Sequence, residues 1–233
     1  MSLHLNSNNN NSLRSFSFSL WNANGLRATT IQDVLSHVTN SDLLFITETW
    51  LTAGYLPANW SQYHLYGTLV SNGNGRGSGG VSCFVSPHCS IPVTQLPSPN
   101  AYTLSVKIGS VNVHCSYFPP SLSRELVLSA LRSIPLGSDT ILCGDFNARL
   151  GPFIGDSITT PRGTDLTTWC EQQDLLVLNT SLAHGVSTFS TFRQNTEQRS
   201  IIDLFLTNIP DWNFKHPSLV VECDLSLGSI IDL

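Results

Sequence analysis

The sequence is poor in charged residues. Asp, Glu, Lys and Arg make up 12% of its 233 residues, about half the usual share. The 11 basic residues are outnumbered by 16 acidic ones, which argues against a protein that holds nucleic acid mainly through a bulk positive field. A local basic rim around an acidic site remains compatible with this balance. Because 41% of the residues are hydrophobic, a charge-driven disordered chain is excluded and a sizeable core is expected.

The sequence also lacks the motifs of several common protein classes. No two of its six cysteines have the C-x-x-C spacing of a zinc or thioredoxin-like site, and Cys83, Cys115 and Cys143 stand in apolar runs where buried thiols are expected. Neither a secretory signal nor a run of ~18 apolar residues is present. We therefore expect an intracellular protein, in the nucleus or the cytoplasm, with no membrane partner.

One dinucleotide-binding motif is misleading. Residues 75–80 satisfy G-x-G-x-x-G, a pattern that opens a helix after a strand in dinucleotide-binding proteins. Here the extended run VSCFV follows it, so we expect a flexible hairpin loop instead.

The order of the hydrophobic patterns predicts a layered α/β domain. A strand at 15–21, a helix at 30–38 and a buried strand at 42–47 open the domain. Two strand pairs that resemble hairpins then predict a mixed sheet. We expect one domain over 15–233 after a disordered, Asn/Ser-rich leader at 1–14. The other predicted strands are 64–70, 80–85, 101–108, 110–117, 139–143, 175–178, 201–206 and 218–223, and the other helices are 123–133 and 164–173.

Polar residues recur where buried-looking strands end. In open α/β sheets, sites form in the crevice at strand ends, and carboxylate and amide oxygens gathered there suit Mg²⁺ or Mn²⁺. Such an ion can polarise a phosphate for attack by water. The residues in these positions are Asn22, Glu48, Tyr117, Asp145 with Asn147, and Asp203.

Each of these residues also has a purely structural interpretation. Asn22 precedes Asn24-Gly25 and is equally compatible with turn chemistry. Glu48 is equally compatible with a loop or helix start, and Tyr117 with a core aromatic. An Asx turn would account for Asp145, although less well for an Asp and an Asn that flank a Phe. An unpaired carboxylate at Asp203, inside an apolar strand, would be costly, so a partner or a metal is expected.

Taken in order, these segments resemble the endonuclease/exonuclease/phosphatase superfamily. They are most similar to the apurinic-endonuclease-like domain of non-LTR retrotransposons. The resemblance implies a four-layer, DNase I-like sandwich of two mixed β-sheets flanked by helices. It rests on WNANGLR (21–27), ITETWL (46–51), RGSGGVSCFV (76–85), SYFPP (116–120), GDFNARLG (144–151), RGTDLTTWCEQQDLLVLNT (162–180), STF (187–189) and SIIDLFLTN (200–208).

The resemblance implies roles for the residues that it matches. Glu48 falls on a metal-binding glutamate, Asn22 on an asparagine that shapes the metal and phosphate site, and Asp145 on the aspartate that orients or deprotonates the attacking water. Mg²⁺ or Mn²⁺ is the implied cofactor. The implied reaction is hydrolysis of a DNA phosphodiester that leaves a 3′-hydroxyl, which in retroelements primes a partner reverse transcriptase domain.

The remaining matches concern the phosphate. Asn147 falls on a residue that steadies the phosphoryl group, and Tyr117 on a tyrosine that contacts the scissile phosphate. Asp203 falls on an aspartate that pairs with a catalytic histidine. That histidine belongs to a Ser-Asp-His motif, whereas this chain reads Ser229-Ile230-Ile231.

The departure from Ser-Asp-His leads to two expectations. The domain is expected to lack its closing strand and to leave a sheet edge exposed. Activity is expected to be impaired, because loss of such a group costs on the order of 10²–10⁴ in rate. A phosphatase, an RNA-directed nuclease and an inactive nucleic-acid-binding remnant therefore stay open as alternatives.

Arginines in loops near the motif ends are candidate contacts to DNA phosphates. A loop arginine is more often simply solvated, so a solvated surface position stays the alternative for each of them. They are Arg76, Arg149, Arg162, Arg193 and Arg199.

Overall fold

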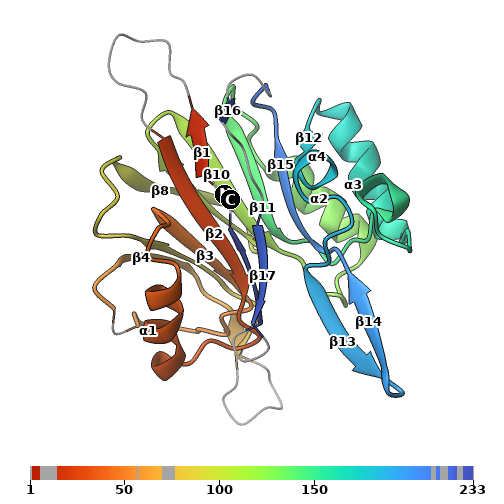
Figure 1. Cartoon of the computed structure of the whole chain (residues 1–233). Helices are drawn as coiled ribbons and strands as arrows, with labels where there is room; N and C mark the ends of the chain where they lie inside the picture. The colour runs from red at the N-terminus through yellow and green to blue at the C-terminus, as the bar shows by residue number, and fades with distance from the viewer. Residues whose placement is uncertain are drawn as a thin grey trace.

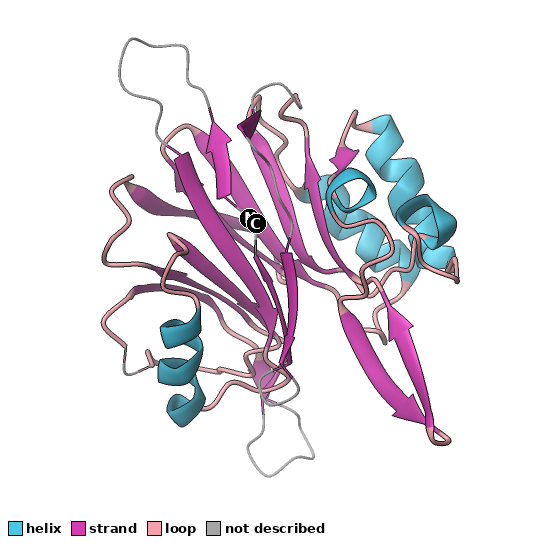
Figure 2. Cartoon of the chain, in the orientation of Figure 1, coloured by secondary structure: helices cyan, strands magenta, loops and turns pink. Residues whose placement is uncertain are grey.

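Two β-sheets pack face to face, with helices on their outer faces (Figure 1). Figure 2 shows the helices gathered in two separate groups, one on each side of the sheets. The four-layer arrangement expected from the sequence is therefore confirmed. The computed structural model describes residues 2–5, 15–56, 58–69, 77–210, 214–215, 220–224 and 228–232.

The first sheet is mixed. Strands β2 and β3 run parallel, joined by helix α1 as a parallel crossover requires, and β7 and β4 continue the sheet in antiparallel fashion. All five residues of β3 are buried, as expected for an apolar strand covered on both faces. In spatial order the strands are β16 (Phe214–Lys215), β1 (Ser2–Leu5), β2 (Ser15–Asn22), β3 (Leu43–Thr47), β7 (Val81–Val85) and β4 (Ser61–Leu65), and β18 (Gly228–Asp232) and β17 (Val220–Asp224) extend it from β2.

The second sheet is also mixed. Its strands β10 and β11 are parallel, while β9–β10 is the predicted hairpin, turning at Gly109, where φ is 56°. In spatial order the strands are β12 (Leu176–Val177), β15 (Asp203–Thr207), β11 (Thr140–Asp145), β10 (Val111–Tyr117), β9 (Thr103–Ile108) and β8 (Val93–Asn100).

The core has three layers of apolar contacts. Between the sheets, Phe18 of β2 packs edge-on against Phe45 at a centroid distance of 5.8 Å and lies 5.9 Å from Phe205 of the second sheet. The predicted buried thiols of Cys83, Cys115 and Cys143 belong to this layer. One further cluster lies under α1 and another under α2 and α3. The helical elements are α1 (Ala28–His37), α2 (Arg124–Ser133), the 3₁₀ turn η1 (Gly151–Ile154), α3 (Pro161–Gln172) and α4 (Asn179–Leu182).

Two hairpins lie outside the sheets. Strands β13 (Phe189–Arg193) and β14 (Thr196–Ser200) pair over their full length, and Figure 1 shows this hairpin projecting from the body of the molecule. Its turn has positive φ at both Gln194 and Asn195, as two-residue hairpin turns require. The second is the short pair β5 (Thr68–Leu69) and β6 (Gly77–Ser78).

The structure corrects several sequence predictions. Gly228–Asp232 forms β18, which pairs with Ser19–Trp21 of β2, so the edge expected to be exposed is covered there. Residues 2–5 of the expected disordered leader form β1, paired with β2, and residues 6–14 lie outside the described part. The predicted strand at 64–70 is divided into β4 and β5, and β8, β13 and β14 were not predicted. Gly77–Gly80 leads into strand β7 and not a helix, as expected. No helix among the described residues is both long and apolar enough to cross a bilayer.

Candidate active site

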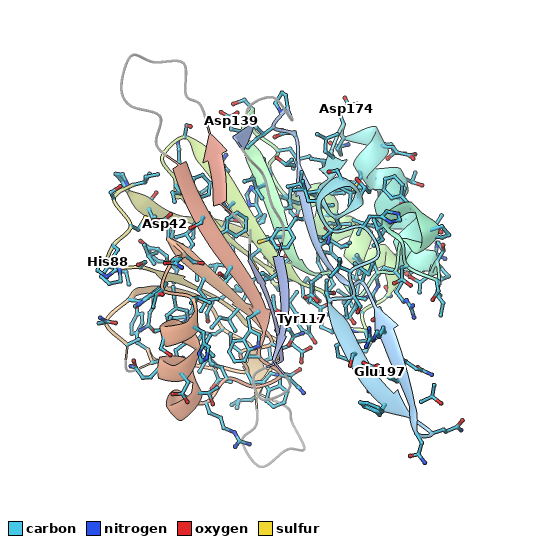
Figure 3. All side chains as sticks on the ribbon, in the orientation of Figure 1. Asp42, His88, Tyr117, Asp139, Asp174 and Glu197 are labelled. Atoms are coloured by element: carbon cyan, nitrogen blue, oxygen red, sulfur yellow. The ribbon has the colours of Figure 1, made fainter. Side chains whose placement is uncertain are left out.

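The predicted strand-end residues converge at one end of the sandwich. Asn22 ends β2 and Glu48 follows β3 in the first sheet. In the second sheet, pairing places Tyr117 opposite Asp145, and Asp145 opposite Asp203. Figure 3 shows Tyr117 near the point where the β13–β14 hairpin leaves the body, far from Asp139 at the other end of β11.

Asn22 connects the two sheets through its side-chain amide. Its Nδ2 donates to Oε1 of Glu48 at 3.1 Å and to Oδ2 of Asp145 at 2.9 Å. Its Oδ1 accepts from the backbone N–H of Asn24 at 3.0 Å, so the turn chemistry considered from the sequence is also present. One amide therefore orients two carboxylates that lie 97 positions apart in the chain.

Asp145 is held in a polar but buried position. Its side chain is buried, and burial raises its pKa to about 7. The backbone N–H of Asn147, which donates to Oδ1 at 2.9 Å, opposes this shift, and the negative charge of Glu48 adds to it. A carboxylate with a pKa near 7 is suited to accept and release a proton at neutral pH.

Asp203 is buried beside Asp145 and has one uncompensated oxygen. Burial raises its pKa well above the usual range, and the charge of Asp145 adds to this. Hydrogen bonding with the Thr188 side chain opposes the shift. Its Oδ1 has no hydrogen-bond partner within the described residues. The partner or metal expected from the sequence is thus still required by the physics of this carboxylate.

Tyr117 is a buried proton donor in the site. Burial raises the pKa of its hydroxyl above the usual value, and so do the charge of Glu48 and a hydrogen bond to the Glu48 side chain. The phenol therefore stays protonated at neutral pH. Tyr117 is thus the core aromatic considered from the sequence, and its hydroxyl meets the carboxylates.

The turn after β3 explains the glycines in the segment at 75–80, for which the sequence predicted a flexible hairpin loop. Glu48 and Trp50 have positive φ values of 52° and 55°, which side chains other than Gly rarely adopt. Gly80 lies against the Thr49 hydroxyl and Gly77 against the Trp50 carbonyl, so closely that a Cβ at either glycine would overlap them. The glycines of RGSGG therefore allow the strand to approach the strained turn that presents Glu48.

A comparison with known protein families agrees with the arrangement of these residues. The model of the endonuclease/exonuclease/phosphatase family matches residues 19–226. This protein belongs to that family. The family includes endonucleases, exonucleases and phosphatases, which hydrolyse phosphate esters. No curated protein sequence shows a significant match to the chain.

Solved structures of the same fold include several nucleases. The endonuclease domain of TRAS1, a telomere-specific non-LTR retrotransposon, superposes with a TM-score of 0.69 at 19% identity, over 93% of this chain and 96% of that one. An AP endonuclease from Archaeoglobus fulgidus gives 0.67 at 12% identity, over 93% and 98%. The 3′ phosphatase NExo from Neisseria, bound to a product DNA hairpin, gives 0.60 at 16% identity, over 93% and 98%. At these identities the likeness establishes the fold.

The carboxylates of this endonuclease/exonuclease/phosphatase domain fit a hard cation. No group of three or more His, Cys, Asp and Glu side chains forms a ready metal cage within the described ranges. However, the negative charge of Glu48 raises the pKa of Asp145, and a buried oxygen of Asp203 has no hydrogen-bond partner among the described residues. An all-oxygen donor set with excess negative charge is what Mg²⁺ or Mn²⁺ prefers. Glu48 is the least buried of the three and the best placed to contact an ion.

Arg162 has a structural position that sequence analysis did not predict. It is buried, and its guanidinium donates to five backbone carbonyls in the loops after β10 and β11. The hypothesis of a DNA contact at Arg162 is therefore wrong. Its acceptors are the carbonyls of Phe118, Pro119, Pro120, Leu122 and Phe146.

The other candidate arginines lie in different surroundings. Arg149 forms a forked ion pair with buried Asp156 and also donates to the Arg199 carbonyl. The Arg199 side chain is two-thirds exposed on the projecting hairpin and pairs with Glu197, which is labelled there in Figure 3. Arg193 lies at the end of β13, and Arg76 lies outside the described residues.

Asn147 contributes to the site through its backbone and its amide. It has positive φ, which Asn tolerates better than most residues. Its backbone N–H binds Asp145, and its Nδ2 donates to the Phe118 carbonyl at 3.2 Å. The Asx turn considered from the sequence is thus present, and it is part of the site's geometry.

Proposed function

We propose that this protein is a metal-dependent, DNA-nicking endonuclease of retroelement type. The observation that carries the proposal is the Asn22 amide, which holds Glu48 and Asp145 together across two sheets. A carboxylate that titrates near neutral pH beside a second, more exposed carboxylate suits metal-assisted hydrolysis of a phosphodiester.

The chain's own residues then have distinct tasks. Asp145 orients the attacking water and accepts its proton, and the Asn22 amide and the Asn147 backbone N–H fix its orientation. Tyr117, protonated at neutral pH, donates a hydrogen bond to a non-bridging oxygen of the phosphate. Asn147 steadies the same phosphoryl group, and Asp203, once it is ionised, would offset the positive charge of a bound cation.

Glu48 would hold Mg²⁺ or Mn²⁺, with Asn22 and Asp145 beside it. When bound, the ion supplies charge neutralisation and polarisation of the phosphate. Its presence would also lower the electrostatic cost of keeping Asp145 and Asp203 close together. The product would be a nick with a 3′-hydroxyl, available to a reverse transcriptase domain as a primer.

Duplex DNA would lie across the end of the sandwich and reach the projecting hairpin. Arg199, exposed on β14, is the best-placed candidate phosphate contact, and Arg193, at the end of β13, stays a candidate from the sequence. Arg76 stays a candidate from the sequence alone, and Arg149 has part of its charge engaged by Asp156. The support from related structures is that TRAS1 and the AP endonucleases share the fold.

Nicking of supercoiled plasmid tests the proposal. We expect Mg²⁺- or Mn²⁺-dependent conversion to open circles, abolished by EDTA and lowered on the order of 10²–10⁴-fold by Asp145→Ala. Leu126→Ala, an exposed position on α2, is the matched control and should nick at the wild-type rate. Nicking that persists unchanged in Asp145→Ala would contradict the assignment of the site.

A second candidate function is supported by Asp203, whose buried Oδ1 lacks a partner within the described residues. A domain in which Asp203 lacks its partner would retain the phosphate-binding residues and bind nucleic acid without turnover. It would then show salt-dependent DNA binding with no nicking even at high Mn²⁺. Release of inorganic phosphate, or cleavage of RNA in preference to duplex DNA, would indicate a phosphatase or an RNA nuclease instead.

A further inference from the structure

Three aromatic rings form a continuous row on the outer face of the first sheet, and the proposed hydrolysis does not use them. The ring of His64 lies 5.5 Å from that of Tyr66 in a stacked arrangement and 5.4 Å from that of Tyr55. Tyr55 is 76% exposed and Tyr66 is 40% exposed. Large aromatic faces open to water are costly unless something covers them.

Hydrogen bonds hold this row in place. His64 Nδ1 lies 2.7 Å from the Ser82 hydroxyl, and its Nε2 lies 3.2 Å from Gln62 Oε1. The Tyr66 hydroxyl donates to the Gly54 carbonyl at 3.0 Å, which fastens the loop that carries Tyr55. A rigid set of rings loses little conformational entropy when it binds a flat ligand.

Strand register places the row beside the candidate active site. Asn22, Thr47, Val81 and Leu65 lie opposite one another across four strands. Glu48 directly follows Thr47, and Tyr66 directly follows Leu65. Because β7 lies between β3 and β4, the backbones at Glu48 and Tyr66 are two strand spacings apart, or about 10 Å. The same loop that carries Tyr55 starts directly after Glu48 and Trp50.

The row faces away from the core, toward the side that carries α1. Tyr63 and Leu65 pack against the layer between the sheets, so strand alternation directs His64 outward. Tyr66, just past the end of β4, stacks on His64. His64 contacts Phe84 of the cluster under α1 at 6.1 Å. Burial lowers the pKa of His64, so its ring is uncharged at neutral pH.

We propose that Tyr55, His64 and Tyr66 form a stacking platform for an unpaired nucleobase of the substrate strand. The inference rests on the proposed function, because the nearby carboxylates then fix the position of the strand's backbone. Flat, neutral rings suit a base, and a platform about 10 Å from Glu48 suits a base close to the scissile phosphate. Stacking on such rings contributes to binding of single strands irrespective of sequence.

Equilibrium binding in EDTA tests the platform without turnover. The probes are a fluorescent oligothymidine of about 12 nucleotides and an oligonucleotide of equal length with abasic residues, whose backbone charge is the same. We expect the wild type to bind oligothymidine more tightly. Tyr55→Ala should weaken oligothymidine binding by about 5- to 100-fold and leave abasic binding unchanged, whereas Tyr55→Phe should retain both.

The controls separate this inference from the proposed function. Tyr55 is mostly exposed, so its replacement leaves the fold intact, and Leu126→Ala on α2 should bind both probes as the wild type does. Equal wild-type affinity for the two probes, or an equal loss on both in Tyr55→Ala, would overturn the platform even where plasmid nicking proceeds. Discrimination between the probes without any nicking would overturn the hydrolysis and leave the platform standing.

Discussion

The two sheets supply the candidate site in different ways. The second sheet places Tyr117, Asp145 and Asp203 within its strands, where pairing alone puts them opposite one another. The first sheet presents Glu48 from a turn beyond the end of β3, with a positive φ. The strand-borne residues are buried, and the turn-borne one is partly exposed.

The strand-borne residues and the turn-borne residue, the two halves of the site, therefore have different roles. The strand-borne half sets protonation, since burial raises the pKa of Asp145, Asp203 and Tyr117. The turn-borne half faces outward, where an ion and a phosphate would enter. Asn22 is the connection between the halves, because its amide donates to a carboxylate of each.

The largest expected effect comes from disrupting the strand-borne half at Gly144. This glycine has φ of 139°, and a Cβ there would overlap the carbonyl of Ser116 on the neighbouring strand. Gly144→Ala should lower the free energy of unfolding by about 4 kcal/mol or more, because backbone strain and overlap add.

Gly79→Ala is the matched comparison in the loop that supports the turn-borne half. Its φ is 72°, but the nearest atoms to a Cβ are 3.9 Å away, on the Tyr117 ring. We expect a loss of about 1–2 kcal/mol. Urea unfolding of both variants measures this, and equal losses would show that the register of the second sheet is not the more constrained feature.

Arg162 gives the next largest effect. Arg162→Met removes donors from five carbonyls in the loops after β10 and β11, for an expected cost of about 3 kcal/mol. Arg124→Met, which breaks the exposed pair with Asp165, should lower the melting temperature much less, because exposed ion pairs contribute little to stability. Thermal unfolding compares the two, and similar melting temperatures would contradict the structural assignment of Arg162.

The sequence predicted the strand-borne half better than the turn-borne half. Apolar runs ending at Asp145 and Tyr117 located strands β11 and β10, and with them the convergence of both side chains. The strain at Glu48 could not be predicted, because it depends on glycines about 30 residues away that pack against Thr49 and Trp50. The RGSGG pattern, read locally, indicated only a loop.

Contacts with residues distant in the sequence account for the other differences between the predictions and the structure. Arg162 looked like a surface arginine because its acceptors are backbone carbonyls, which leave no mark in the sequence. Strand β8 was missed because its two prolines disfavour a strand, yet it pairs as an edge strand with β9. The sequence at Ile230 and Ile231 indicated a missing strand. In the structure these two residues belong to β18 and pair with Trp21 and Leu20 of β2.

The pH dependence of stability should separate the two halves further. Because the folded-state pKa of Asp145 is raised to about 7 from 3.8, the folded state holds the proton more tightly than the unfolded state. Stability from this group is therefore present below pH 4 and is lost as the pH rises toward 7. In EDTA, the melting temperature of Asp145→Asn relative to the wild type should rise on the order of 5 °C from pH 4 to pH 8.

The test is how the difference in melting temperature between Asp145→Asn and the wild type changes with pH. The absolute melting temperature is not the test, because Asn also changes the hydrogen bond with Asn22 at every pH. Parallel curves would show that Asp145 is not protonated more readily in the folded state. Added Mg²⁺ should raise the melting temperature of the wild type at pH 8 more than that of Asp145→Asn, because a bound cation offsets the repulsion among the carboxylates.

The smallest effect is expected at Glu48 itself. A non-glycine residue at φ of 52° costs about 1 kcal/mol relative to glycine, so Glu48→Gly should be about 1 kcal/mol more stable than Glu48→Ala while both lose metal-dependent nicking. The Ala variant is the proper reference, since both substitutions remove the same carboxylate and its repulsion with Asp145. Chemical denaturation of Glu48→Gly and Glu48→Ala measures the difference in their free energies of unfolding. A Gly variant no more stable than the Ala variant would mean that the turn carries no strain. If the difference holds, the chain retains a destabilising backbone conformation at the least buried of the three site carboxylates, which is what a requirement to present a metal ligand would produce.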